Sequence, residues 1–157
     1  MKQSKLKTIL ILASSLFVIT LQSCSKESDG ENESKISSHG ANDSHNMGQN
    51  CMGCHSQGGS GSGWFVVAGT VYNSAKTITY PNATVKLYTG ANGTGTLKYT
   101  IQGDAKGNFY TTENIDFGSG LYPSVQGSTG TQNMSTAITM GQCNSCHGVS
   151  TDKIWTN

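Results

Sequence analysis

Apart from one apolar run near the N-terminus, the hydrophobic positions of this chain are gathered in short runs in its middle, separated by glycine-rich stretches. Residues 64–72 form a continuous β-branched and aromatic run, which is typical of a buried strand. Residues 83–88 and 96–101 alternate apolar and polar positions, as strands with one buried face do. Two further short runs, at 108–112 and 121–126, lie beyond these. The pattern predicts a mainly β protein, with a small β-sandwich over residues 64–126.

The N-terminal pattern indicates an export signal rather than a folded element. Lysines at positions 2, 5 and 7 precede an apolar run over residues 8–21, which is short for a membrane span. The run ends at Leu21-Gln22-Ser23-Cys24, which resembles the signal of a bacterial lipoprotein. The resemblance implies a lipoprotein signal peptide over residues 1–23 and a lipid anchor at Cys24, with the protein expected at the outer membrane of the envelope. An ordinary signal peptide with a nearby cysteine is the alternative.

Polar residues dominate both flanks of the predicted sandwich. Residues 24–44 are rich in Ser, Asn, Gly and acidic side chains, with Ile36 as an apolar exception, so we expect a disordered tether there. Residues 45–63 are polar and rich in glycine, residues 127–157 are also largely polar, and each segment contains the same five-residue motif. We expect these two segments to be irregular and to flank the β domain.

The repeated motif is Cys-x-x-Cys-His, at residues 51–55 and again at residues 143–147. Two thiols at this spacing can add to the two vinyl groups on one porphyrin edge, and the adjacent histidine can then bind the iron. With two copies in an exported chain, the sequence resembles a c-type cytochrome. The resemblance implies two covalent haem c groups. Their ligands would be Cys51, Cys54 and His55 at the first, and Cys143, Cys146 and His147 at the second.

The same four cysteines admit other interpretations. They could bind one structural zinc ion, form two small disulfide loops in an oxidising compartment, or act as thioredoxin-like redox pairs. The last needs a βαβ context, which the glycine-rich flanks do not favour. Zinc would explain the cysteines but not the histidine that follows each pair, so haem is the preferred interpretation.

Each iron needs a sixth ligand if the protein only carries electrons. His45 lies six residues before the first motif and Met134 lies nine residues before the second, so each can loop round the edge of its own haem. We therefore expect His55 with His45 at the first iron and His147 with Met134 at the second. One alternative is that the methionines only pack on haem edges. Another is two bis-histidine irons that also use His39, which requires both segments to converge; a sandwich with an odd number of strands does not favour this.

Four short motifs occur in order within the predicted β domain, at residues 67–71, 81–87, 104–109 and 120–122. They are Val-x-Gly-x-Val, Pro-x-Ala-x-Val-x-Leu, Asp-x-x-Gly-x-Phe and Gly-x-Tyr. Their order resembles that of the carboxypeptidase regulatory-like, or transthyretin-like, domain. The resemblance implies a transthyretin-like or Ig-like β-sandwich of a kind common on cell surfaces, with no catalysis.

Charge and composition narrow the function further. The net charge is +1 and all ten basic residues are lysines, without a basic patch that would suggest nucleic-acid binding. No paired carboxylates, Ser-His-Asp spacing or phosphate-binding loop points to catalysis. We therefore expect a membrane-anchored dihaem cytochrome that passes electrons to redox partner proteins in the bacterial envelope or at the cell surface. The alternatives are a haem enzyme or sensor with one open iron site, and a surface binding or adhesion module with accessory haem.

Overall fold

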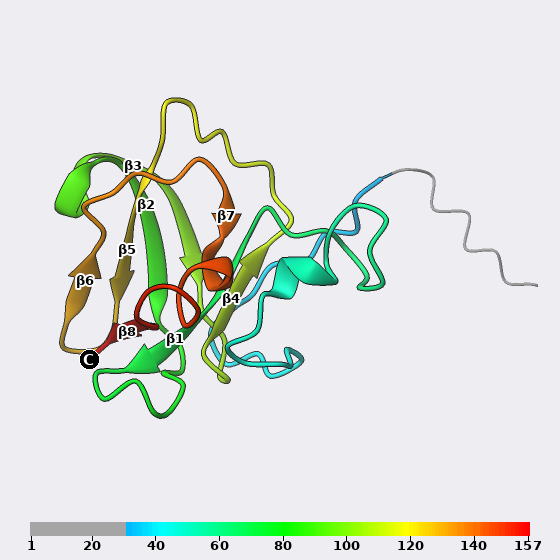
Figure 1. Cartoon of the computed structure of the whole chain (residues 1–157), viewed down its shortest axis with the longest axis horizontal. Helices are drawn as coiled ribbons and strands as arrows, with labels where there is room; N and C mark the ends of the chain where they lie inside the picture. Colours follow the sequence, from blue (N-terminus) through cyan, green and yellow to red (C-terminus); the bar gives the residue numbers. More distant parts are fainter. Residues whose placement is uncertain (1–30) are drawn as a thin grey trace, which may run out of the picture. The chain divides into compact units, whose positions relative to one another are not determined.

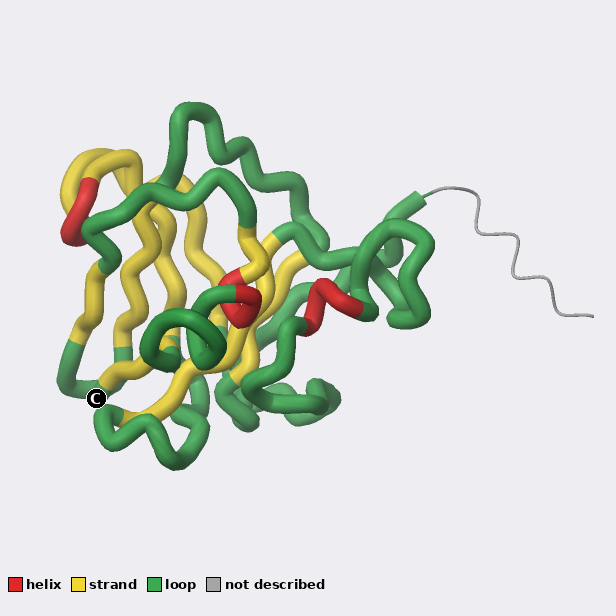
Figure 2. The backbone as a smooth tube through the Cα atoms, viewed as in Figure 1, coloured by secondary structure: helices red, strands yellow, loops and turns green. Residues whose placement is uncertain are grey.

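The computed structural model describes residues 31–157, and residues 32–157 form one compact unit (Figure 1). The expected signal peptide and Cys24 lie outside the described residues. The described part is mainly β, as the hydrophobic pattern predicted (Figure 2). Its strands are β1 (Val67–Asn73), β2 (Thr84–Gly90), β3 (Thr94–Gln102), β4 (Asn108–Thr111), β5 (Tyr122–Gln126), β6 (Thr131–Asn133), β7 (Gly141–Gln142) and β8 (Ile154–Thr156). Its short 3-10 turns are η1 (Cys51–Gly53), η2 (Ala91–Gly93) and η3 (Cys143–Ser145).

The strands form two sheets, and β1 is the centre of the first. It pairs with β4 in antiparallel and with both β7 and β8 in parallel. The second sheet is antiparallel, in the order β3-β2-β5-β6. Three of these strands, β6, β7 and β8, come from residues 127–157 (Figure 1). The β structure therefore extends beyond the expected range of 64–126, and the segment expected to be irregular completes both sheets.

One hydrophobic cluster takes side chains from both sheets. Alternate positions of β1 contribute Val67 and Val71, and alternate positions of β2 contribute Val85 and Leu87, all of them buried. The opposite face of β1 is buried as well, so residues 67–72 have no exposed position. The continuous apolar run, unlike the alternating ones, thus marks a strand that is covered on both faces.

The described part of the expected tether lies along β4 instead of standing free. Ile36 forms a β-bridge with Thr111. The buried Ser37 donates its N–H to the carbonyl of Tyr110 (2.9 Å) and its hydroxyl to the carbonyl of Gln102 (2.5 Å). These hydrogen bonds are made by backbone and hydroxyl groups. The tether was predicted from the lack of apolar side chains, and such hydrogen bonds cannot be predicted from that pattern.

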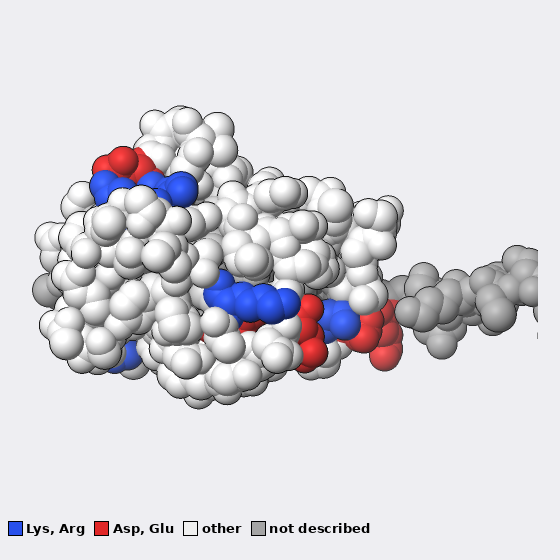
Figure 3. Space-filling model, turned by 90° about the horizontal axis from the view of Figure 1, so that it is seen from below, with Lys and Arg blue, Asp and Glu red and all other residues white. Residues whose placement is uncertain are grey.

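Charged side chains are sparse, and on the face drawn in Figure 3 they form small islands in an uncharged surface. The ion pairs of the described residues include Lys35 with Glu33 (3.1 Å) and Lys76 with Asp152 (2.6 Å). The second pair ties the loop after β1 to the loop before β8. Within residues 31–157, no helix is long and apolar enough to cross a membrane.

Candidate functional site

Both Cys-x-x-Cys-His motifs fold into the same local structure, a 3-10 turn that begins at the first cysteine. In the first motif, the carbonyl of Cys51 accepts the N–H groups of Cys54 (3.2 Å) and His55 (2.9 Å). The second motif repeats both bonds to the carbonyl of Cys143, at 3.3 and 3.0 Å. In each copy, the two thiols and the imidazole that follows them are therefore attached to one turn of the backbone.

The two motif histidines also share one protonation pattern. Nδ1 of His55 lies 3.1 and 3.2 Å from the carbonyl oxygens of Ser62 and Gly63, and Nδ1 of His147 lies 2.7 Å from that of Asp152. A carbonyl oxygen can only accept, so the imidazole must donate through Nδ1–H. The free lone pair is then on Nε2, which is the arrangement of a metal-binding histidine whose other nitrogen is held by the protein.

The His55 ring packs against its own loop and against an aromatic neighbour. An added Cβ at Gly61 would lie 2.7–2.8 Å from three atoms of the ring, so only glycine lets the loop pass this close. Phe65 stacks on the imidazole, with the centres 4.3 Å apart and the planes 12° apart, and Tyr110 stacks on Phe65 at 4.8 Å. These contacts fix the direction in which Nε2 points.

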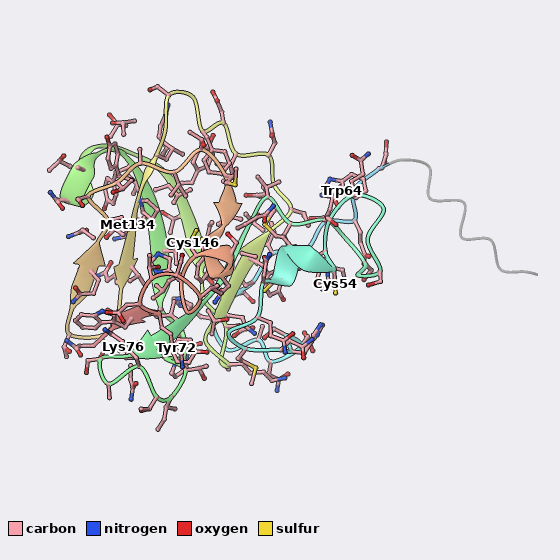
Figure 4. The ribbon with its side chains drawn as sticks, in the orientation of Figure 1. Cys54, Trp64, Tyr72, Lys76, Met134 and Cys146 are labelled. Atoms are coloured by element: carbon pink, nitrogen blue, oxygen red, sulfur yellow. The ribbon has the colours of Figure 1, made fainter. Side chains whose placement is uncertain are left out.

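The His147 loop is held by charged residues instead. Lys76 pairs with the carboxylate of Asp152 and lowers the pKa of that carboxyl, chiefly by hydrogen bonding. Lys153 donates to the carbonyl of Lys76 (3.1 Å) and lies over the ring of Tyr72, 4.2 Å from its centre. Figure 4 shows Lys76 and Tyr72 at the same end of the first sheet. The carbonyl that orients His147 is thus anchored to β1 and to the loop after it.

His45, the expected second ligand of the first iron, lies close to His55. The ring centres are 5.9 Å apart and the planes are tilted by 39°. Metal–nitrogen bonds of about 2 Å on each side, plus about 1 Å from nitrogen to ring centre, put two imidazoles on one metal ion roughly 6 Å apart. Both histidines line a cavity of about 210 Å³ together with Cys51 and Cys54. The separation of the two rings is therefore the one expected for two imidazoles on a single metal ion.

The two motifs themselves lie side by side on β1, although the strand count did not favour such convergence. The side-chain amide of Asn144, inside the second motif, donates to the carbonyl of Gly48, just before the first (3.3 Å). Cys143 packs close to β1 at Gly69, where an added Cβ would lie 3.0 Å from the Cβ of the cysteine. The parallel strands β7 and β8 bring the second motif back to this position.

Met134 and His39 are positioned by the second sheet. The N–H of Met134 donates to the carbonyl of Pro123 (2.9 Å) and its carbonyl accepts the N–H of Asn92 (3.3 Å), which puts it beside β5 and η2. Nε2 of His39 lies 3.4 Å from a threonine hydroxyl on β2. No such contact links Met134 to the loop that holds His147, and the pairing of these two residues stays a prediction.

The four motif cysteines are free thiols. Burial raises the pKa of the Cys51 thiol and raises that of Cys143 to about 12. Within residues 31–157, no three His, Cys, Asp or Glu side chains are gathered as a metal site. The geometry therefore gives no support to one zinc ion held by all four cysteines.

Sequence reasoning missed three buried polar side chains beside the motifs, namely Thr70, Asn108 and Asn144. Thr70 is the polar residue inside the apolar run of β1, and that exception to the run is the one signal that could have identified it. Asn108 and Asn144 lie inside the Asp-x-x-Gly-x-Phe and Cys-x-x-Cys-His motifs, at positions that these motifs leave open, so nothing in the sequence singled them out.

No family model matches the chain, and comparisons with curated proteins and with solved structures find no similar protein. Function must therefore be inferred from the chemistry of the site itself.

Proposed function

We propose that this chain is a membrane-anchored dihaem c-type cytochrome that passes electrons to redox partner proteins in the bacterial envelope or at the cell surface. One observation carries the proposal: both motif histidines have Nδ1 within hydrogen-bond distance of a backbone carbonyl, a contact that requires Nδ1–H and leaves the lone pair of a neutral imidazole on Nε2. A haem-binding histidine needs this arrangement. Neither a pair of disulfides nor a four-cysteine zinc site would require it of the residue after each cysteine pair.

The chain's own residues then have defined roles. Cys51 and Cys54 would hold the first haem c covalently, and the equivalent cysteines of 143–147 would hold the second. Haem bound there would supply a one-electron iron couple. His45 is the proposed second ligand at the first iron, supported by its 5.9 Å separation from His55. Met134 is the proposed second ligand at the other iron, and it rests on sequence spacing alone.

The adjacency of the two motifs supports a role in electron transfer. The contact between Asn144 and Gly48 places the second motif against the residues that lead into the first. Two redox groups on neighbouring segments can exchange electrons within one molecule, which a carrier between two partners needs. The β scaffold would be a transthyretin-like sandwich, an interpretation supported by the shared hydrophobic cluster of the two sheets.

The anchor belongs to the same proposal and rests on the sequence around Cys24. Replacing Cys24 by serine should release the protein from the membrane fraction of cells that express the full chain. Unchanged membrane association of the Cys24→Ser protein would rule the anchor out.

Intact mass and an absorption spectrum test the haem assignment directly. The chain is expressed together with haem-maturation machinery, alongside Cys51→Ala/Cys54→Ala and Cys143→Ala/Cys146→Ala. The parent should carry two haems and each variant one, while Met52→Ala, a change at a variable motif position, should keep both. A colourless parent would favour the zinc, disulfide or binding-module alternatives. A ferrous parent that binds CO would favour the enzyme or sensor with an open iron.

A further inference from the structure

A buried threonine connects the two motifs through hydrogen bonds. Thr70 lies on β1 and is 0% exposed. Its hydroxyl donates to Oδ1 of the buried Asn108 (2.6 Å) and accepts the N–H of Gly48 (2.9 Å). The carbonyl of the same glycine accepts the amide of Asn144 (3.3 Å). One hydroxyl thus fastens the loop before the first motif to β1, directly beside the second motif.

Asn108 extends this network to His45. Its Nδ2 donates to the hydroxyl of Ser44 (2.9 Å) and to the carbonyl of His45 (3.2 Å). Lys106 adds one further bond, from Nζ to the carbonyl of Ser44 (2.6 Å). The His45 side chain is itself exposed. Its position opposite His55 therefore depends on how its backbone is held.

Packing alone does not explain the pair of buried polar groups. Burying a hydroxyl and an amide costs free energy unless both are hydrogen-bonded, and two apolar side chains of similar volume would fill the same space without that cost. What the polar pair does, and an apolar pair could not, is bond the loop at 44–48. We propose that Thr70 is a positioning residue for His45: its hydroxyl, through Asn108 and Gly48, holds this loop so that the two imidazoles face one metal ion. The inference rests on the proposed haem function.

The experiment compares Thr70→Val with Thr70→Ser in the haem-loaded full chain. Valine keeps the shape and removes the hydroxyl, whereas serine keeps the hydroxyl. CO uptake by the ferrous protein is measured by absorption, with His45→Ala as the reference for an opened first iron. We expect Thr70→Val to bind CO at up to about half of the total haem, as His45→Ala does, and Thr70→Ser to stay insensitive. The double variant Thr70→Val/His45→Ala should take up no more CO than His45→Ala alone.

The outcomes separate the two proposals. A parent without covalent haem by mass overturns the proposed function. The positioning role is overturned if the parent carries two haems, His45→Ala binds CO and Thr70→Val does not. This holds even if the Thr70→Val protein melts at a lower temperature. A CO-insensitive His45→Ala protein removes His45 as a ligand and overturns the inference with it. If Thr70→Val does not fold, Asn108→Asp, which removes the donors to Ser44 and His45 and keeps Oδ1, is judged by the same criteria.

Discussion

Replacing Asp104 by alanine is expected to destabilise the protein strongly, whereas asparagine should be tolerated. Asp104 is fully buried, and its Oδ1 accepts the backbone N–H groups of Lys106 and Asn108, both at 2.9 Å. Alanine would remove this acceptor from both N–H groups, at about 1–3 kcal/mol each and roughly 2–6 kcal/mol together. Asparagine keeps Oδ1, so its cost should be about 1 kcal/mol, the difference between charge-assisted and neutral hydrogen bonds.

The second carboxylate oxygen does not disturb this comparison. Oδ2 of Asp104 is buried and has no hydrogen-bond partner among the described residues, and the amide nitrogen of asparagine would take the same unpaired place. Urea unfolding followed by circular dichroism measures both variants. With an m-value of about 1.5 kcal/mol/M, a loss of about 3 kcal/mol moves the midpoint by roughly 2 M, and the asparagine variant should move it by less than about 1 M. Equal shifts for the two variants would refute the reasoning, because the charge rather than the two N–H bonds would then stabilise the turn.

Three further outcomes are expected from single changes. Gly61→Ala should lower the free energy of unfolding by about 1–3 kcal/mol, measured by thermal unfolding, because its Cβ would overlap the His55 ring. Gly53→Ala is the control: its Cβ would face open space, so the change should stay within about 0.5 kcal/mol. Equal changes for the two variants would contradict the close approach of the loop to the ring. In haem-free protein at pH 8, alkylation of Cys143 should be slower than that of the exposed Cys54 and Cys146, because a pKa raised to about 12 leaves Cys143 less thiolate. Mass mapping that finds Cys143 among the first thiols labelled would contradict this expectation. Removing residues 154–157 should lower the melting temperature by at least about 5 °C, because β1 loses its partner β8, and an unchanged melting curve would show that this pairing is dispensable.

The patterns of β1 and β2 could be predicted because side-chain burial creates them, whereas most positions of β3 are exposed. β2 alternates buried and partly exposed positions, and the continuous run at 64–72 contains most of β1, a strand covered on both faces. β7 and β8 could not be predicted in this way. They have two and three residues, and they are held by parallel backbone pairing with β1, which leaves no periodicity in the side chains.

The same distinction applies to the candidate site: features set by local sequence spacing could be predicted, and features set by the fold could not. Covalent spacing identified the two cysteine motifs and proposed His45 as a partner of His55, since six residues suffice to loop back. The adjacency of the motifs depends on where residues 127–142 run, and the sequence of that polar stretch does not encode it in any apolar pattern. Thr70 and Asn108 act through a few hydrogen bonds to partners that are far away in the chain. Such pairs become visible only in three dimensions.

The parallel pairing of β1 with β7 and β8 has a consequence for the order of events during synthesis. Residues 67–73 leave the ribosome roughly 80 residues before β8 is complete, which takes about 4–17 s at normal translation rates. For most of this interval β1 lacks both of its parallel neighbours, and the first pair of thiols is present before Cys143 and Cys146 have been made. An enzyme that acts on the growing chain would therefore meet the first motif before the second. Delays at this stage would expose an apolar strand edge, the kind of surface that aggregates.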